Sequence, residues 1–191
     1  MPTGPAASTA LPVLATASDP TDHRSRLEQE VVALFDQFRD RLLRYLVGFG
    51  LTIPDGEEVI QEVFLSLFQH LQRGKSRENL RGWVFRVAHN LALKRRYQTR
   101  RSLGVLTEEG AAEALAVDPA PNPETQMVNN QTQQRLRAVL QALPEQARRC
   151  LALRAEGLQY REIAQVLDMS LGAVSLSLAR SLARMARAVE R

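Results

Sequence analysis

The chain has 191 residues, of which 45% are hydrophobic and 24% charged, with a net charge of +4 and a pI near 9.8. This length permits one domain or two small ones with a packed core, and the single cysteine excludes an intrachain disulfide framework and fits a reducing cytosol. No apolar run approaches the length of a membrane span, so we expect a cytoplasmic protein with no membrane insertion.

Charge is distributed unevenly along the chain. Residues 23–101 contain 15 Lys and Arg against nine acids, whereas residues 102–127 contain five acids and no Lys or Arg. Residues 148–191 again contain eight Arg against four acids. The pattern predicts two basic units joined by an acidic linker.

The first basic unit begins after an N-terminal segment rich in Pro, Ala, Ser and Thr. We interpret residues 1–23 as a disordered lead, because they lack both an apolar periodicity and the basic start of a signal peptide. From Arg24, apolar residues recur every three or four positions up to Leu46, which predicts a helix that Gly48 and Gly50 end.

A second helix is predicted after Pro54, with Asp55 as its N-cap and Glu58 completing a capping box. Its outer face is acidic and includes Glu57 and Glu62. Such a face is either a solvated surface or the contact for a protein partner.

The third helix, residues 79–101, has the most informative pattern of the first unit, and Asn79 is its predicted cap. One side is apolar, and the other carries basic residues and His89, with Trp83 and Tyr97 beside them. A basic face interleaved with aromatic rings is suited to phosphates and unstacked bases, although a core helix with a solvated basic rim gives the same pattern.

The acidic segment at residues 102–127 contains Pro119, Pro121 and Pro123, which exclude a helix there, so it is predicted to be a flexible linker. The second unit, residues 128–191, contains a helix that ends at Pro144 and another that ends at Gly157.

A short helix at residues 160–167, a turn at residues 168–170 and a longer helix from Leu171 then give a helix-turn-helix pattern. Ser170 is the predicted cap of the last helix. An ordinary helical hairpin is the alternative. No strand alternation occurs anywhere, so the predicted fold is all-α: residues 24–101 and 128–191 form two small helical domains.

Signatures of catalysis are missing. The sequence has no Gly-rich phosphate loop, metal cluster or nucleophile elbow. The three histidines are scattered and are expected at the surface, and Cys150 is expected in the core. We therefore predict a protein that is not an enzyme and that needs no metal and no cofactor.

Two segments resemble a known family. PDGEEVIQEVFLSLFQHL followed by NLRGWVFRVAHNLALKRRYQTRR resembles region two of bacterial extracytoplasmic-function (ECF) sigma factors, and LPEQARRCLALRAEGLQYREIAQVLDMSLGAVSLSLAR resembles their region four. The resemblance implies a promoter-specificity subunit of RNA polymerase. It implies core polymerase (the β′ clamp helices and the β flap) and promoter DNA as partners, and an anti-sigma factor as a further one.

The resemblance also implies roles for individual residues of region two. The acidic second helix would bind the β′ clamp helices, and the third helix would bind the minus-ten element as the duplex opens. The polymerase-binding candidates are Asp55, Glu57, Glu58, Gln61, Glu62 and Leu65. The minus-ten candidates are Asn79, Arg81, Arg86, Asn90, Arg96 and Arg100.

Region four would place its last helix in the major groove of the minus-thirty-five element. The DNA-binding candidates there are Ser170, Ala173, Ser175, Leu176, Ser177, Arg180 and Arg184. The chain departs from the family pattern, because Ser175 and Ser177 stand where relatives commonly carry Lys and Arg, and Asp168 replaces the usual turn Gly. Leu176 points outward, and it contacts either a thymine methyl or a protein partner.

We therefore predict a sigma subunit that binds core polymerase and melts promoter DNA. Two alternatives stay open. One is a stand-alone helix-turn-helix regulator of duplex DNA, and the other is a sigma-derived adaptor that binds only proteins.

Overall fold

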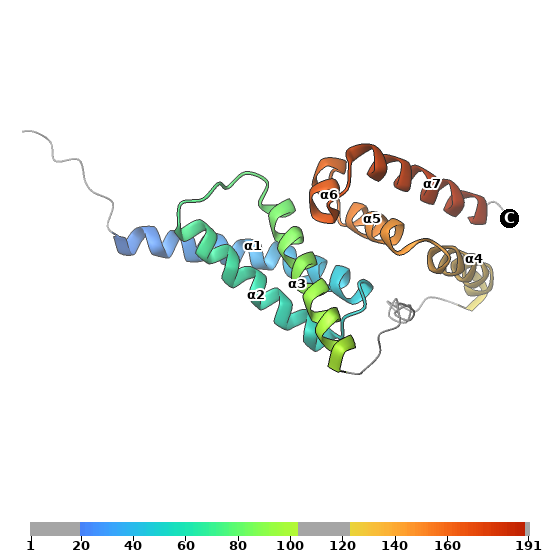
Figure 1. Cartoon of the computed structure of the whole chain (residues 1–191). Helices are drawn as coiled ribbons and strands as arrows, with labels where there is room; N and C mark the ends of the chain where they lie inside the picture. Colours follow the sequence, from blue (N-terminus) through green and yellow to red (C-terminus); the bar gives the residue numbers. More distant parts are fainter. Residues whose placement is uncertain (1–19, 103–122, 190–191) are drawn as a thin grey trace, which may run out of the picture.

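The computed structural model describes residues 20–102 and 123–189, which form seven α-helices and no strand (Figure 1). The all-α prediction is confirmed. The N-terminal bundle consists of α1 (Pro20–Gly48), α2 (Ile53–Gln72) and α3 (Leu80–Ser102). The C-terminal bundle consists of α4 (Pro123–Gln141), α5 (Glu145–Ala155), α6 (Tyr160–Leu167) and α7 (Leu171–Val189).

The N-terminal bundle is built on the antiparallel pair α1 and α2, and α3 crosses this pair (Figure 1). The apolar stripes predicted from the three- and four-residue spacing all face inward, because each helix has one apolar side that must leave water. Fully buried side chains of this core include Leu42, Leu46, Ile60, Leu67 and Phe85.

Two helices begin earlier than the sequence indicated. Helix α1 starts at Pro20, so residues 20–23, expected in a disordered lead, are helical, and residues 1–19 lie outside the described residues. Helix α4 starts at Pro123, five residues before the expected start of the second unit at Val128, and residues 103–122 are likewise outside the described part. Proline suits both positions, because the first turn of a helix needs no backbone N–H donor.

The N-cap of α2 is Thr52, and the prediction of Asp55 as the cap is wrong. Thr52 Oγ1 accepts a hydrogen bond of 3.3 Å from the Asp55 backbone N–H, and it donates one of 2.6 Å to Asp55 Oδ2. Pro54 therefore lies inside the first turn, where its fixed φ fits the helix.

The start of α3 agrees with the prediction that Asn79 caps it. Asn79 Oδ1 accepts a 3.0 Å hydrogen bond from the Gly82 backbone N–H. Asn79 has φ +53°, a left-handed conformation that Asn tolerates better than most residues. A Cβ on Gly82 would lie 2.5 Å from Asn79 Nδ2, so the cap depends on glycine at that position.

The C-terminal bundle contains the predicted helix-turn-helix. Helices α6 and α7 meet at 107°, within the range of such motifs, and α4 and α5 pack against α7. Asp168 supplies the tight turn in a left-handed conformation with φ +52°, and Ser170 Oγ accepts a 3.2 Å hydrogen bond from the Ala173 N–H. Cys150, Leu153, Ile163, Val174 and Leu178 form the core of this bundle, which confirms that the cysteine is buried.

The two bundles pack against each other. Helix α3 contacts α6, α1 contacts α5, and the buried residues of both bundles form one continuous cluster. In Figure 1 the N-terminal end of α3 points toward α6. Within the described ranges no single helix is long and apolar enough to cross a bilayer, and α6 and α7 pass that test only as a bent pair.

Candidate nucleic-acid interface

The four arginines of α3 that are predicted to contact DNA divide into two sets. Arg86, Asn90, Tyr97 and Arg100 follow one side of the helix at four-, seven- and three-residue steps, and Leu93 fills the seven-residue gap. Arg86 and Asn90 are exposed, Arg100 is half-exposed, and the Tyr97 ring is 67% exposed. We call these five residues the α3 stripe. It combines positive charge, an amide and an accessible ring on one surface of the N-terminal bundle.

The other two predicted arginines contact the C-terminal bundle. Arg81 Nη2 lies 3.0 Å from Glu162 Oε2 of α6, and Arg96 Nη1 lies 2.7 Å from Glu145 Oε1 of α5. In this closed arrangement Arg81 and Arg96 are paired with carboxylates and do not belong to the α3 stripe.

Further ion pairs join the bundles near the same place. Arg41 and Arg44 of α1 contact the Glu156 carboxylate at 3.3 and 3.2 Å. The Phe49 ring lies between two guanidinium groups, with Arg96 4.9 Å and Arg149 4.6 Å from its centroid. These residues, with Arg81, Glu145 and Glu162, make up what we call the interdomain contact.

Burial opposes ionisation of Glu145 in this contact, but hydrogen bonds and charge from Arg96 and Arg149 outweigh it and lower the pKa of Glu145. The carboxylate therefore stays charged at neutral pH, as an ion pair between the bundles requires.

His89 is not at the surface, so that prediction is wrong. It is 4% exposed, and its Nδ1 lies 2.8 Å from the Tyr45 hydroxyl. Phe49 packs edge-on against the imidazole at 5.3 Å. Burial, followed by the positive charge of Arg149, lowers the pKa of His89 to about 4, and burial raises that of Tyr45. Both groups are neutral at pH 7 and serve the core.

The acidic face of α2 is partly neutralised within the N-terminal bundle. Arg95 of α3 contacts Asp55 at 3.1 Å and also pairs with Glu58, and Arg39 pairs with Glu57. A hydrogen bond from Thr52 and then one from Arg95 lower the pKa of Asp55. The other predicted polymerase contacts are Gln61, Glu62 and Leu65, which are all exposed, Leu65 at 60%.

The helix-turn-helix presents most of its predicted residues to solvent. Ser177 is the exception among them, since it is half-buried and its hydroxyl lies against Cys150. The exposed ones are Ser170, Ala173, Ser175, Leu176, Arg180 and Arg184.

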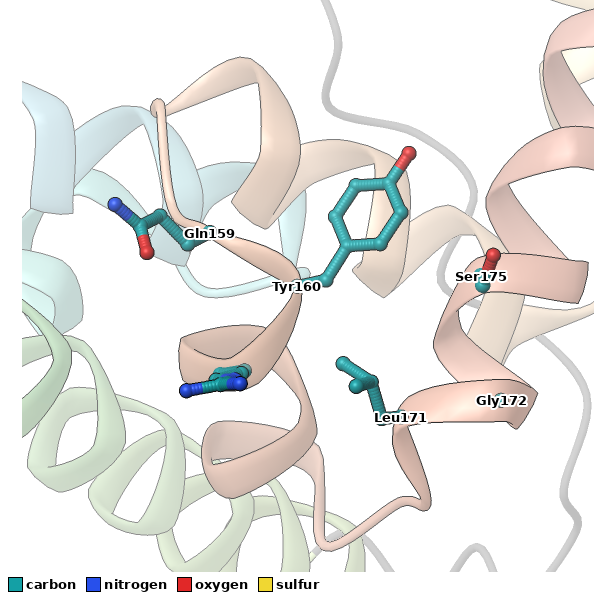
Figure 2. Close-up of a pocket in the computed structure, with 6 residues that line it drawn as sticks. Gln159, Tyr160, Leu171, Gly172 and Ser175 are labelled. Atoms are coloured by element: carbon teal, nitrogen blue, oxygen red, sulfur yellow. The ribbon is translucent and has the colours of Figure 1, made fainter.

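Figure 2 shows an open hollow between α6 and α7 that the sequence did not indicate as part of the interface. It is lined by Gln159, Tyr160, Arg161, Leu171, Gly172 and Ser175. Tyr160 lies at the start of α6 and Leu171 at the start of α7 (Figure 2). Sequence reasoning missed residues 159–161. Their position at the start of the first helix of the helix-turn-helix is the feature that could have identified them. Among the described residues, no group of three or more His, Cys, Asp and Glu side chains could hold a metal ion.

Family models match both bundles. The model described as Sigma-70 region 2 matches residues 34–102, and the one described as Sigma-70, region 4 matches residues 133–185. The two matches lie in the expected order and together span more than half of the chain. The chain belongs to the sigma-70 family.

Two curated relatives of the chain are ECF sigma factors. The chain is 27% identical over 130 residues to the ECF RNA polymerase sigma-E factor of Escherichia coli (strain K12), a match that covers 64% of this chain and 68% of that protein. It is 31% identical over 144 residues to the ECF RNA polymerase sigma factor SigE of Mycolicibacterium smegmatis, covering 74% of this chain and 54% of that one. This protein is a sigma subunit of RNA polymerase.

Two solved structures share its fold. One is CnrH in complex with the cytosolic domain of CnrY, with a TM-score of 0.56 and 18% identity over 87% of this chain and 94% of that one. The other is the sigma factor RpoE in complex with the anti-sigma factor NepR from Bartonella quintana. It has a TM-score of 0.62 and 16% identity, and the match covers 87% of this chain and 98% of that one.

Proposed function

We propose that this sigma factor binds core polymerase through α2, holds the separated strands of the minus-ten element on α3, and binds the minus-thirty-five element with α7. It contributes binding and strand separation, and the bond chemistry belongs to the polymerase. A cytoplasmic location follows from this partner.

The observation that carries this proposal is the α3 stripe. Arg86 and Arg100 are 14 residues apart, or about 21 Å along the helix, so each can contact a different phosphate of one strand, and the exposed Tyr97 ring lies between them along the helix. Stacking on an aromatic side chain is sequence-tolerant and is worth roughly 1–3 kcal/mol per base, so the stripe favours bases that have left the duplex. A surface that prefers unstacked bases pulls the equilibrium toward melted DNA.

Docking on the polymerase is assigned to the exposed part of α2. Gln61, Glu62 and Leu65 form a patch with one negative charge and one large apolar side chain. This chemistry suits a helical partner with basic and apolar side chains, which is what the family resemblance implies for the β′ clamp helices.

Control by an anti-sigma protein is also proposed. The two solved structures described above are complexes with a protein partner, CnrH with the cytosolic domain of CnrY and the sigma factor RpoE with the anti-sigma factor NepR. We infer that a partner of this kind binds the present chain and competes with polymerase.

Reconstitution with core RNA polymerase tests the function. The chain should co-elute with core enzyme in a one-to-one complex and direct transcription from specific start sites. In R86A/R100A, run-off transcript and permanganate-reactive thymines should fall by about tenfold or more, and the salt slope of single-strand binding should drop by about 1.4, because each lost phosphate contact removes about 0.7.

The matched control is R137A, which removes an exposed arginine of α4 and should leave transcription unchanged. Failure to bind core enzyme would indicate a stand-alone regulator, and core binding without a specific start would indicate an adaptor. Full activity of folded R86A/R100A would refute the role of the α3 stripe.

A further inference from the structure

The outward surface of α7 before Arg180 carries no charged and no amide side chain, and the Ser175 hydroxyl is its exposed polar group. Residues 171–179, LGAVSLSLA, contain no charged and no amide side chain, and the first basic residue is Arg180. Val174 and Leu178 are fully buried, so the opposite side of the helix, centred on Leu176, points away from the core. Leu176 is 50% exposed and is the largest side chain of that outward surface before Arg180.

This composition limits which bases the helix can read. Guanine is read by the forked donors of Arg or by Lys, and adenine by the paired groups of Asn or Gln. Neither kind of side chain occurs in residues 171–179, and the exposed Ser175 hydroxyl can contact either base, so it does not discriminate between them. Thymine is the base with an apolar group in the major groove, its C5-methyl, and a leucine side chain complements that group.

The surroundings of this surface favour DNA over an apolar protein partner. Arg161 of α6 and Arg180 and Arg184 of α7 are all exposed, and Arg161 lines the hollow in Figure 2 together with Leu171 and Ser175. Cations on either side of an apolar centre match a groove whose two edges are phosphates and whose floor carries methyl groups. A hydrophobic protein groove would leave these guanidinium groups without partners.

We propose that the protein recognises its minus-thirty-five element through thymine methyl groups, with Leu176 as the specificity-determining residue. The element is rich in T·A pairs, and no position in it requires guanine. Phosphate contacts from Arg161, Arg180 and Arg184 fix the register of α7 but carry no sequence information. This inference rests on the proposed function, because it concerns the duplex that the holoenzyme binds.

The test uses the full chain reconstituted with core polymerase. A promoter library randomised over the upstream element is selected for holoenzyme binding, and the enriched sequences should contain thymine at one or more fixed positions. Each selected thymine is then replaced by deoxyuridine, which differs only by the missing methyl. At the position that contacts Leu176 the replacement should weaken binding about fourfold, or 0.8 kcal/mol, the value of one buried methyl group.

Leucine variants connect the effect to one side chain. L176A should bind the thymine and deoxyuridine promoters equally. L182A is the matched control, because Leu182 is a similarly exposed leucine on α7 (52%) that lies away from the outward side, and it should keep the fourfold preference.

Three results would overturn the proposal: enrichment of guanine at these positions, equal binding of thymine and deoxyuridine by wild type, or a preference that persists in L176A. An upstream region with no enrichment would identify this surface of α7 as a protein contact. Failure of the proposed function is distinguishable, because the holoenzyme would then start no specific transcript on any promoter.

Discussion

The hydrogen bond between His89 and Tyr45 shows how a single contact changes the role of a residue. Helical periodicity placed His89 on the charged side of α3, and its immediate neighbours contain nothing that would bury it. The side chains that cover it, Tyr45 and Phe49, come from the end of α1 and the residue after it, 40 to 44 positions earlier. Periodicity describes one helix at a time, so it cannot register a ring that arrives from another.

Acid should therefore destabilise the N-terminal bundle. The pKa of His89 is about 4 in the folded chain and near 6.5 in the unfolded chain, so the unfolded state binds more protons between these values. The stabilisation is complete above pH 6.5 and is lost as the pH falls toward 4, by about 3 kcal/mol in all.

Urea unfolding followed between pH 7.5 and 4.5 measures this loss. H89Q should show a shallower dependence on pH than wild type. Parallel curves for wild type and H89Q would contradict the assignment.

At the scale of elements, the sequence correctly predicted those helix caps and turns whose hydrogen-bond partners are close in the chain. The cap at Asn79, the turn at Asp168 and the cap at Ser170 involve partners within a few residues, and all three are as expected. The cap of α2 was misassigned because Thr52 and Asp55 are both good capping residues, and only the position of Pro54 in the first turn decides between them.

The cap of α3 should depend jointly on Asn79 and Gly82. In wild type, G82A places a Cβ against the Asn79 side chain, so the lost cap cancels the gain in helix propensity. In an N79G background nothing opposes the new methyl, and G82A should stabilise the chain. The coupling free energy from the double-mutant cycle should be about 1 kcal/mol.

Thermal or urea unfolding of the four proteins measures this coupling. G172A is the control, because a Cβ on Gly172 meets nothing within 4 Å, and its effect should be the same in both backgrounds. Strictly additive effects on the free energy of unfolding at positions 79 and 82 would refute the joint dependence of the α3 cap on Asn79 and Gly82.

The relation between the bundles was beyond the reach of sequence reasoning. Arg81 and Arg96 have the spacing of solvent-facing residues, and nothing in the local pattern indicates that Glu162 and Glu145, 81 and 49 residues away, neutralise them. Four arginines of α3 were predicted together to bind DNA, but the closed arrangement pairs Arg81 and Arg96 with carboxylates and leaves Arg86 and Arg100 for the α3 stripe.

Weakening the interdomain contact should open the molecule. E156K replaces a carboxylate that pairs with Arg41 and Arg44 by a third positive charge. The radius of gyration from small-angle scattering should increase. Affinity for single-stranded minus-ten DNA should rise by about tenfold if the open form is a tenth of the wild-type population, because Arg81 and Arg96 become available.

E28K, which makes the same change in net charge at an exposed position of α1, should leave the scattering curve unchanged and bind DNA close to wild type. Equal dimensions for E156K and wild type would show that these ion pairs do not hold the bundles together.

The pairing of Arg81 and Arg96 with carboxylates has a consequence for the chain in the cell. Those carboxylates and the phosphodiester backbone compete for the same guanidinium groups, so any nucleic acid shifts the equilibrium toward the extended form, whatever its sequence. The chromosome itself then acts as a mass-action effector, because the amount of accessible DNA sets how much of this subunit is in the extended form.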